Sequence, residues 1–413
     1  MRAACYNASM RNVIFAAPFP LETTMRFARG AAALDGVRLL GLVQKPPPGD
    51  DARLFDDVVQ VKDGLDAHDL IEGARLLERR HGPIHRVLGI LEPLQVQLAE
   101  VRRALGVVGT DPATADLFRD KARMKNELRR HGLPCARHRL IATWSDAEDF
   151  VAEVGFPLVL KPPAGMGCKS TWTIRTADDL RAALRALHAG PNNPALAEEF
   201  LRGREFSFET ITIGGRVVFK SFTRYYPSPL EVMETPWIQW VVVLPRNIEG
   251  PGFDDAQMLG VRAVHALGLE TGFTHMEWFR RDDGSLAIGE IAARPPGAHI
   301  VLANSYAYGT DMYRAWARAV VDDTFDGPFE RQFAVGVAFL RGVGHGRVAR
   351  VHGVDQANAK VGHLVVESRL PVPGTPRAES YEGDGYVIVR DPDSEVVKAA
   401  MATIIETIQI EYS

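Results

Sequence analysis

The chain has 413 residues, a formal net charge of −4, 46% hydrophobic residues and 24% charged residues. This is the composition of an ordinary globular protein with room for two or three domains. The charge argues against a broad nucleic-acid surface, and no apolar run approaches the roughly 18 residues of a membrane span. Cys5, Cys135 and Cys168 lie far apart, which favours free thiols in a reducing compartment. We therefore expect a cytoplasmic protein that has no nucleic-acid or membrane partner.

Residues 11–111 alternate predicted strands and helices. The strands are expected at 12–17, 37–43, 58–61 and 84–90, and the helices at 22–34, 67–80 and 94–105. This order is typical of a parallel sheet covered by helices, so we predict an N-terminal α/β domain over residues 1–111. Glu92 follows a strand at the edge where such sheets bind ligands. Two alternatives remain for Glu92: it contacts substrate, or it is a loop residue without a functional role.

Asp111-Pro112 marks the predicted boundary to a second domain, residues 112–325. It begins with one predicted helix, from Ala113 through Lys121 to His131, which Gly132-Leu133-Pro134 ends. A small α/β subdomain is expected over about 136–205, followed by a larger antiparallel sheet. Residues 326–413 predict a small strand-rich domain, with strands at 335–340, 363–367 and 385–389 and a helix at 394–408.

A loop of small residues follows a strand that ends on Lys161. It contains Gly165, Gly167, Cys168, Lys169 and Ser170. Glycines let backbone N–H groups approach phosphate oxygens, and a lysine adds a point charge. The loop is not a Walker motif, because no Gly-Lys-Ser/Thr opens a helix at the required spacing. A phosphate site and an ordinary turn are both compatible with this loop alone.

A second polar segment follows about one subdomain later. Glu198, Glu199, Phe200 and Leu201 end a short strand, and Glu205 begins the next strand after a turn. These acids stand where a ribose or an amino group could be held.

Two apolar segments, 274–279 and 288–294, flank a polar turn and predict a β-hairpin. If the turn is the four residues 282–285, Glu277 faces Glu290, with Cβ atoms about 5 Å apart. Two facing carboxylates repel each other unless a cation lies between them, and Mg²⁺ is often held by one or two carboxylates plus nucleotide phosphates. The hairpin predicts such a site, with a solvated surface hairpin as the alternative.

These four segments, in this order, resemble the ATP-grasp superfamily over about residues 85–325. The resemblance implies an α/β ATP-grasp fold, α+β in parts. Its parts are an N-terminal parallel α/β domain, a lid over ATP (136–205), a large antiparallel sheet and a small C-terminal domain. It also implies that Lys121, Lys161 and the loop 165–171 hold the phosphates of ATP. The segment 198–201 would meet adenine, Glu205 the ribose, and Glu277 and Glu290 one or two Mg²⁺ ions, for which Mn²⁺ can substitute.

Within the superfamily, His275-Met276-Glu277 and Glu290-Ile291-Ala292-Ala293-Arg294 resemble the carboxylate–amine ligases of the L-amino acid ligase type. Many ATP-grasp enzymes carry an asparagine metal ligand where this chain has Ala292. The departure argues against the D-alanine ligase pattern, but some purine-pathway members share it. The resemblance implies amino acid substrates and leaves a homodimer open.

The resemblance implies amide formation between amino acids through an acyl phosphate, with release of ADP and phosphate. Arg294 would stabilise the oxyanion, and His275 would orient substrate, act as a base or support its neighbours. Two other functions remain open. One is a purine-pathway-like enzyme that activates formate or bicarbonate. The other is a nucleotide-binding protein with a weakened site, which Ala292 alone favours.

Overall fold

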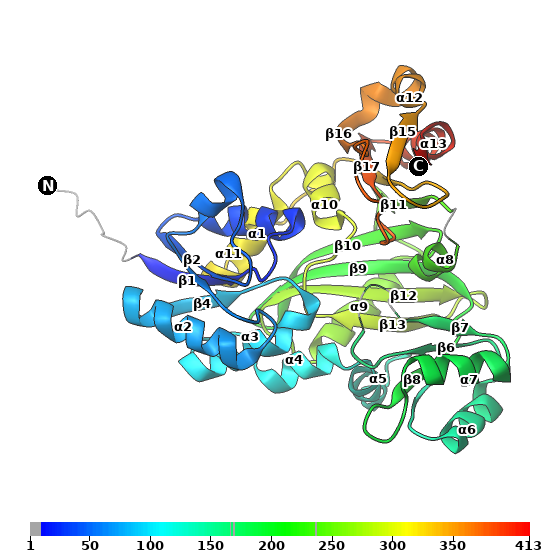
Figure 1. Ribbon diagram of the computed structural model, residues 1–413, viewed down its shortest axis with the longest axis horizontal. Coiled ribbons are helices and arrows are strands. Elements are labelled where there is room, and N and C mark those ends of the chain that lie inside the picture. Colours follow the sequence, from blue (N-terminus) through cyan, green and yellow to red (C-terminus); the bar gives the residue numbers. More distant parts are fainter. Residues whose placement is uncertain (1–9, 166, 168–169, 236–237) are drawn as a thin grey trace, which may run out of the picture.

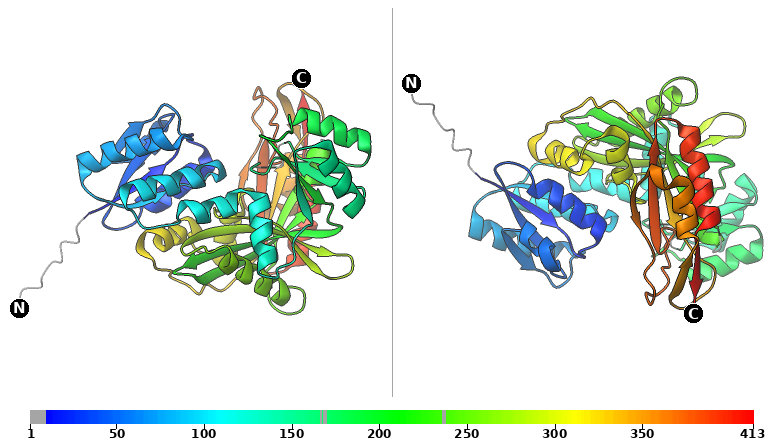
Figure 2. Two further views of the ribbon diagram at one scale, coloured as in Figure 1. Left: turned by 90° about the horizontal axis from the view of Figure 1, so that it is seen from below. Right: turned by 90° about the horizontal axis from the view of Figure 1, so that it is seen from above.

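The computed structural model describes residues 10–165, 167, 170–235 and 238–413. In Figure 1 the N-terminal part (blue) lies at one end of the molecule and the lid (teal to green) at the other, with a large sheet between them. The C-terminal part (orange to red) lies beside that sheet, and Figure 2 shows the same order from below and above. Among the described residues, every helix is too short or too polar to cross a lipid bilayer.

The N-terminal part is the predicted parallel sheet, with strand order β3-β2-β1-β4. Its elements are β1 (Arg11–Ala16), α1 (Glu22–Ala32), β2 (Val37–Val43), β3 (Asp57–Gln60), α2 (Ala67–His81), β4 (Ile84–Leu88) and α3 (Gln95–Leu105). The connection between β2 and β3 contains a short 3₁₀ helix, η1 (Gly49–Leu54). Ile14 packs toward α2 and α3, whereas Phe15 packs toward α1 and α11 (Met312–Asp322). A helix from far along the chain therefore completes the cover of this sheet.

The single helix predicted after residue 112 is wrong, because the chain breaks at Asp120. α4 (Pro112–Arg119) ends there and α5 (Lys121–Arg130) begins. The Asp120 backbone is extended, and its carboxylate accepts hydrogen bonds from Ala122 N and Arg123 N as an N-cap. The break places Lys121 in the first turn of α5, where the residue is 5% exposed.

The lid is a four-stranded antiparallel sheet with the order β5-β8-β6-β7. Its elements are β5 (His138–Ile141), α6 (Trp144–Val154), β6 (Leu158–Lys161), β7 (Trp172–Ile174), α7 (Ala177–Ala186) and β8 (Ala195–Glu199). Capping boxes at Thr143 and Thr176 start the two helices, which pack on the sheet.

The large sheet has eight strands in the order β13-β12-β9-β10-β11-β14-β17-β16. They are β9 (Gly203–Ile213), β10 (Arg216–Tyr226), β11 (Trp240–Leu244), β12 (Gly272–Arg281), β13 (Leu286–Ala292), β14 (Ala334–Leu340), β16 (Val365–Arg369) and β17 (Gly385–Asp391). The strands after residue 325 thus extend the same sheet. The proposed domain ranges stay a prediction.

The remaining elements include a separate two-stranded sheet, β15-β18, and the helices that follow or connect the strands. They are η2 (Glu92–Leu94), α8 (Pro229–Glu234), α9 (Asp254–Ala266), α10 (Ile300–Tyr308), β15 (Val348–His352), α12 (Val354–Val361), η3 (Gly362–Leu364), α13 (Ser394–Thr407) and β18 (Gln409–Tyr412). β15, α12 and β18 were not predicted, since their segments are short and half-exposed.

The β12–β13 hairpin pairs Glu277 with Glu290, as predicted. β12 ends at Arg281 and β13 begins at Leu286, so the predicted turn residues 282–285 connect the two strands. Next to the turn, however, Leu286 pairs with Arg280 and not with Arg281. An extra residue on β13, Gly289, shifts the register back between Glu277 and Trp278. The register shift at the turn and the β-bulge cancel, and the two glutamates remain opposite each other.

The two faces of the large sheet differ in chemistry. Phe208, Met276 and Trp278 lie on the apolar face and pack against α9. Because side chains alternate along a strand, the intervening residues point to the opposite face. That face carries the glutamates of the hairpin.

Candidate functional site

Polar side chains gather on one face of three neighbouring strands. Glu277 of β12 pairs with Ser207 of β9 on one side and with Glu290 of β13 on the other. His275 pairs with Glu209 in the next row. These strands bring together two carboxylates predicted to hold metal and one residue predicted to be catalytic.

Lysines from two other elements reach Glu290. Lys121 Nζ of α5 lies 3.5 Å from Glu290 Oε2, and Lys161 Nζ at the end of β6 lies 3.6 Å from the same oxygen. Burial by itself raises the pKa of Glu290, but the fields of the nearby cations, chiefly Lys121 and Lys161 and then Lys125 and Arg294, outweigh burial, and the pKa falls to about 2. Glu290 is therefore an anion at every physiological pH.

A buried ion network ties the lid to the hairpin. Glu198 lies between two lysines, with Lys161 Nζ 3.0 Å from Oε2 and Lys125 Nζ 2.9 Å from Oε1. Lys125 also donates to the carbonyl of Gly289, the bulge residue beside Glu290. The Lys125 side chain is fully buried, and burial lowers its pKa despite the field of Glu198. Sequence reasoning missed Lys125, although it lies one helical turn after Lys121 on the same face of α5.

Glu205 lies close enough to Glu277 and Glu290 for their charges to raise the pKa of its carboxyl. Burial raises the pKa of its carboxyl well above the ordinary value, and the fields of Glu277 and Glu290 raise it further. A divalent cation between carboxylates would relieve this repulsion, and oxygen ligands of this kind suit Mg²⁺. The residues present therefore fit a hard cation at Glu277 and Glu290.

His275 is enclosed by acids. Its Nδ1 lies 3.1 Å from Glu209 Oε1 and its Nε2 lies 3.8 Å from Glu277 Oε1. Burial opposes the charged ring, but the hydrogen bond with Glu209 and the nearby carboxylate of Glu277 raise the pKa of His275 to about 9. A protonated imidazole has no nitrogen free to accept a proton. This arrangement favours an orienting role for His275 over the role of a base.

Arg294 lies beyond the end of β13 and turns toward Glu92. Its Nε and Nη2 lie 3.1 and 2.9 Å from Glu92 Oε2, while Arg119 Nη1 lies 3.1 Å from Oε1. Burial lowers the pKa of Arg294, but Glu92 raises it by more. Glu92, which is 4% exposed, is thus a buried partner of Arg294 and not a loop position without contacts.

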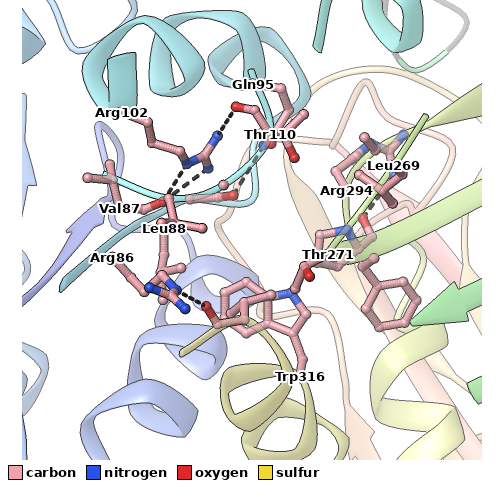
Figure 3. Close-up of a pocket in the computed structure, with 18 residues that line it drawn as sticks. Arg86, Val87, Leu88, Gln95, Arg102, Thr110, Leu269, Thr271, Arg294 and Trp316 are labelled. Carbon is pink, nitrogen blue, oxygen red and sulfur yellow. Dashed lines mark hydrogen bonds between the residues drawn. The ribbon is translucent and has the colours of Figure 1, made fainter. Parts of the chain in front are cut away.

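Arg294 also lines a pocket between the N-terminal sheet and the start of β12. In Figure 3 it lies across this pocket from Arg86 and Arg102. Arg102 donates to the carbonyls of Val87 and Thr110 and thereby ties α3 to the linker before α4. Arg294 therefore lies between this pocket and the polar face of the large sheet.

The loop of small residues that follows β6 packs against Arg119 and Lys121. The carbonyl of Gly165 accepts hydrogen bonds from Lys121 Nζ and Arg119 Nη1, each at 3.0 Å. Gly167 and Ser170 both have positive φ, of 63° and 55°. The predicted site residues Cys168 and Lys169 lie outside the described residues.

The segment predicted to meet adenine lies at the end of β8. Glu199 is held by Arg137 Nε at 2.9 Å and Arg281 Nη2 at 3.0 Å, and Phe200 and Leu201 follow it in an irregular connection to β9. Their backbone groups are outside the ladder of the lid sheet.

Comparisons with known proteins agree on the fold. A family model, the ATP-grasp domain, matches residues 126–301. An L-arginine-specific L-amino acid ligase of Bacillus subtilis is 27% identical over 224 residues, which are 53% of this chain and 53% of that protein. The chain thus matches about half the length of this relative.

Two solved structures are similar over almost the whole chain. The alignment with the L-amino acid ligase from Bacillus licheniformis has a TM-score of 0.79 and 18% sequence identity. It covers 98% of this chain and 99% of that chain. The alignment with phosphoribosylglycinamide synthetase from Anaerococcus prevotii has a TM-score of 0.72 and 16% sequence identity. It covers 98% of this chain and 100% of that chain. At these identities the structural likeness shows the fold alone.

Proposed function

The chain belongs to the ATP-grasp superfamily, and from this premise we propose that it joins amino acids in an ADP-forming carboxylate–amine ligase reaction. The observation that carries the proposal is the surroundings of Glu290. This residue faces Glu277 across the hairpin. Lys121 and Lys161 approach it from two other elements. Carboxylates for a metal and lysines for phosphates converge there, and Arg294 lies two residues beyond the end of β13.

In this proposal Lys121, Lys161 and the loop 165–171 bind the phosphates of ATP. Residues 198–201 bind adenine and Glu205 the ribose. Glu277 and Glu290 would hold Mg²⁺, or Mn²⁺ in its place, which would supply positive charge to offset that of the phosphates. His275, as an imidazolium between Glu209 and Glu277, fixes the orientation of the metal-binding carboxylate.

The reaction has two steps. The carboxylate of one amino acid attacks the γ-phosphorus, which forms an acyl phosphate and releases ADP. The amine of a second amino acid then attacks the acyl carbon, loses a proton and expels phosphate. Arg294 stabilises the anion that develops on the carbonyl oxygen, as preorganised donors do in acyl transfer.

We expect the purified protein to release ADP, and not AMP, only when Mg²⁺ and a suitable pair of amino acids are present. The measurement is a screen of amino acid pairs for ADP and phosphate, with product masses read in parallel. A product mass equal to the two amino acids less one water supports amide formation. Steady release of AMP and pyrophosphate would contradict the proposal.

A purine-pathway-like activity that uses formate or bicarbonate is the second candidate, and it is favoured by the stretch Glu290-Ile291-Ala292, which resembles that of some purine-pathway members. The same screen distinguishes the two when formate and bicarbonate are included. ADP release that depends on either, with no amino acid present, would support the second candidate over the first.

Lys161→Ala is expected to weaken binding of a nonhydrolysable ATP analogue by about tenfold to a hundredfold, the usual range for a lost charge-assisted contact. The fold should survive, because Glu198 keeps its 2.9 Å contact with Lys125. Calorimetric titration measures the affinity, and Lys398→Ala on the surface of α13 is the control. An unchanged affinity in a folded Lys161→Ala variant would assign Lys161 a structural role only.

A further inference from the structure

Glu209 is a buried carboxylate on the polar face of the large sheet, and the proposed reaction gives it no part of its own. It lies on β9, which Figure 1 shows between β12 and β10. Its partner across the ladder on β12 is His275, and Glu209 itself is 0% exposed. A buried carboxylate is costly unless hydrogen bonds or a cation compensate its charge. The groups that compensate Glu209 therefore indicate what it does.

Three side chains contact the Glu209 carboxylate. The Ser207 hydroxyl donates to Oε1, and the Thr223 hydroxyl donates to Oε2 at 3.3 Å. His275 Nδ1 lies 3.1 Å from Oε1. Within the described part of the chain, Glu209 has no ion pair with a lysine or an arginine, so His275 is the basic group that it holds. Two hydroxyls from β9 and β10 thus fix the carboxylate, and the carboxylate fixes one nitrogen of the imidazole.

This contact also fixes the orientation of the His275 ring. A carboxylate only accepts hydrogen bonds, so Nδ1 carries a proton and donates it to Glu209. The other ring nitrogen, Nε2, lies 3.8 Å from Oε1 of Glu277. A half-turn of the ring would place a carbon atom where Nδ1 lies and would lose the hydrogen bond. Glu209 therefore keeps Nε2 directed at Glu277.

Glu277 depends on this ring more than its partner in the hairpin does. Lys121 and Lys161 approach the carboxylate of Glu290 from two other elements. Among the described residues, His275 is the one basic side chain that pairs with Glu277. The direction of the Glu277 carboxylate thus rests on a single imidazole, and that imidazole is held by Glu209.

We infer that Glu209 is a positioning residue that acts through His275 to direct the carboxylate of Glu277 toward the cation. The inference rests on the proposed function, because it requires Glu277 to bind metal. Glu209 lies in the next row of the sheet, so it acts through the ring and not as a ligand. Groups that hold a metal are oriented by hydrogen-bonded partners behind them, and loss of such a partner typically costs about tenfold to a hundredfold in metal affinity.

The test measures Mn²⁺ binding by electron paramagnetic resonance with a saturating nonhydrolysable ATP analogue and no amino acid. Glu209→Gln should raise the Mn²⁺ dissociation constant by about tenfold, because a neutral amide holds Nδ1 less strongly than a carboxylate does. Affinity for the analogue without metal should stay unchanged. The fold should survive, since the hydroxyls of Ser207 and Thr223 can donate to an amide or accept from it. Glu209→Asp, which keeps the charge but shortens the reach, is a second variant with a loss expected in the same direction.

Thr210→Val is the matched control on the same two strands. Thr210 follows Glu209 on β9 and points to the opposite face of the sheet, where its hydroxyl shares a buried hydrogen bond with Thr274 of β12. Loss of this hydrogen bond should lower the melting temperature and leave Mn²⁺ binding unchanged. The control thus separates a general weakening of the β9–β12 pair from a specific effect on the metal site.

A double-mutant cycle tests whether Glu209 acts through His275. His275→Ala should itself weaken Mn²⁺ binding, and Glu209→Gln should then cause no further loss. Unchanged Mn²⁺ affinity in the folded Glu209 variants would overturn the inference, and so would an equal loss with and without His275. If the wild-type protein binds no Mn²⁺, the inference and the metal site proposed at Glu277 are both overturned. Normal Mn²⁺ binding without amide product from any amino acid pair would overturn the ligase proposal alone.

Discussion

Glu290→Gln is expected to reduce ADP-forming turnover by about a thousandfold or more while the protein stays folded, because preorganised charge often contributes more to catalysis than any other effect. The substitution keeps the size of the side chain and removes the charge that faces Glu277. It also removes the anion that Lys121 and Lys161 approach at 3.5 and 3.6 Å. Metal binding and phosphate positioning should therefore fail together. The measurement is the rate of ADP release over a range of Mg²⁺ concentrations.

The fold should tolerate this change, since Lys161 keeps its 3.0 Å contact with Glu198. Melting temperature and circular dichroism provide the check. Asp282→Asn, in the exposed turn of the same hairpin, is the matched control and should leave turnover unchanged. Normal kinetics in folded Glu290→Gln protein would remove the hairpin from the mechanism.

Arg294→Ala is expected to slow amide formation by about a hundredfold, the usual loss when one donor to a developing oxyanion is removed. Nucleotide affinity should change little, because Arg294 forms its ion pair with Glu92, whereas Lys121 and Lys161 contact Glu290. The pair of measurements is the rate of amide formation and the affinity for a nonhydrolysable ATP analogue.

The structure also supplies a way to separate catalysis from stability. After Arg294→Ala, Glu92 keeps Arg119 at 3.1 Å and Lys121 at 3.9 Å, so the buried carboxylate is not left alone. Glu92→Gln keeps the arginine and should reduce the rate less than Arg294→Ala does. Arg318→Ala on α11, which loses contacts with Asp322 and Asp326, is the control for a structural arginine. A lower melting temperature with a normal rate of amide formation in Arg294→Ala would make Arg294 structural.

The repeating order of elements was sufficient to predict the architecture. The alternation of short apolar strands with amphipathic helices predicted the parallel sheet, and the structure has it with the order β3-β2-β1-β4. The pairing of Glu277 with Glu290 was also predicted correctly, because alternation along two strands joined by a short turn leaves few registers. Local patterns determined these features, since each depends on residues close together in the chain.

The break at Asp120 was missed because the helical pattern continues through it. An aspartate can continue a helix or cap a new one, and only the packing of the surrounding elements selects the cap. The bulge at Gly289 was missed for a similar reason, since a register shift beside the turn and the extra residue on β13 cancel at Glu277 and Glu290.

The sequence by itself determined the fold class, the order of the motifs and the identity of the two facing glutamates. Tertiary structure alone decided the contacts of Glu92, Lys125 and Glu209. Lys125 meets Gly289 across 164 positions, Arg294 meets Glu92 across 202, and His275 meets Glu209 across 66. No local period or spacing encodes such contacts. They arise because burial brings distant charges into a medium where each needs a partner, and the folded chain determines which partner is within reach.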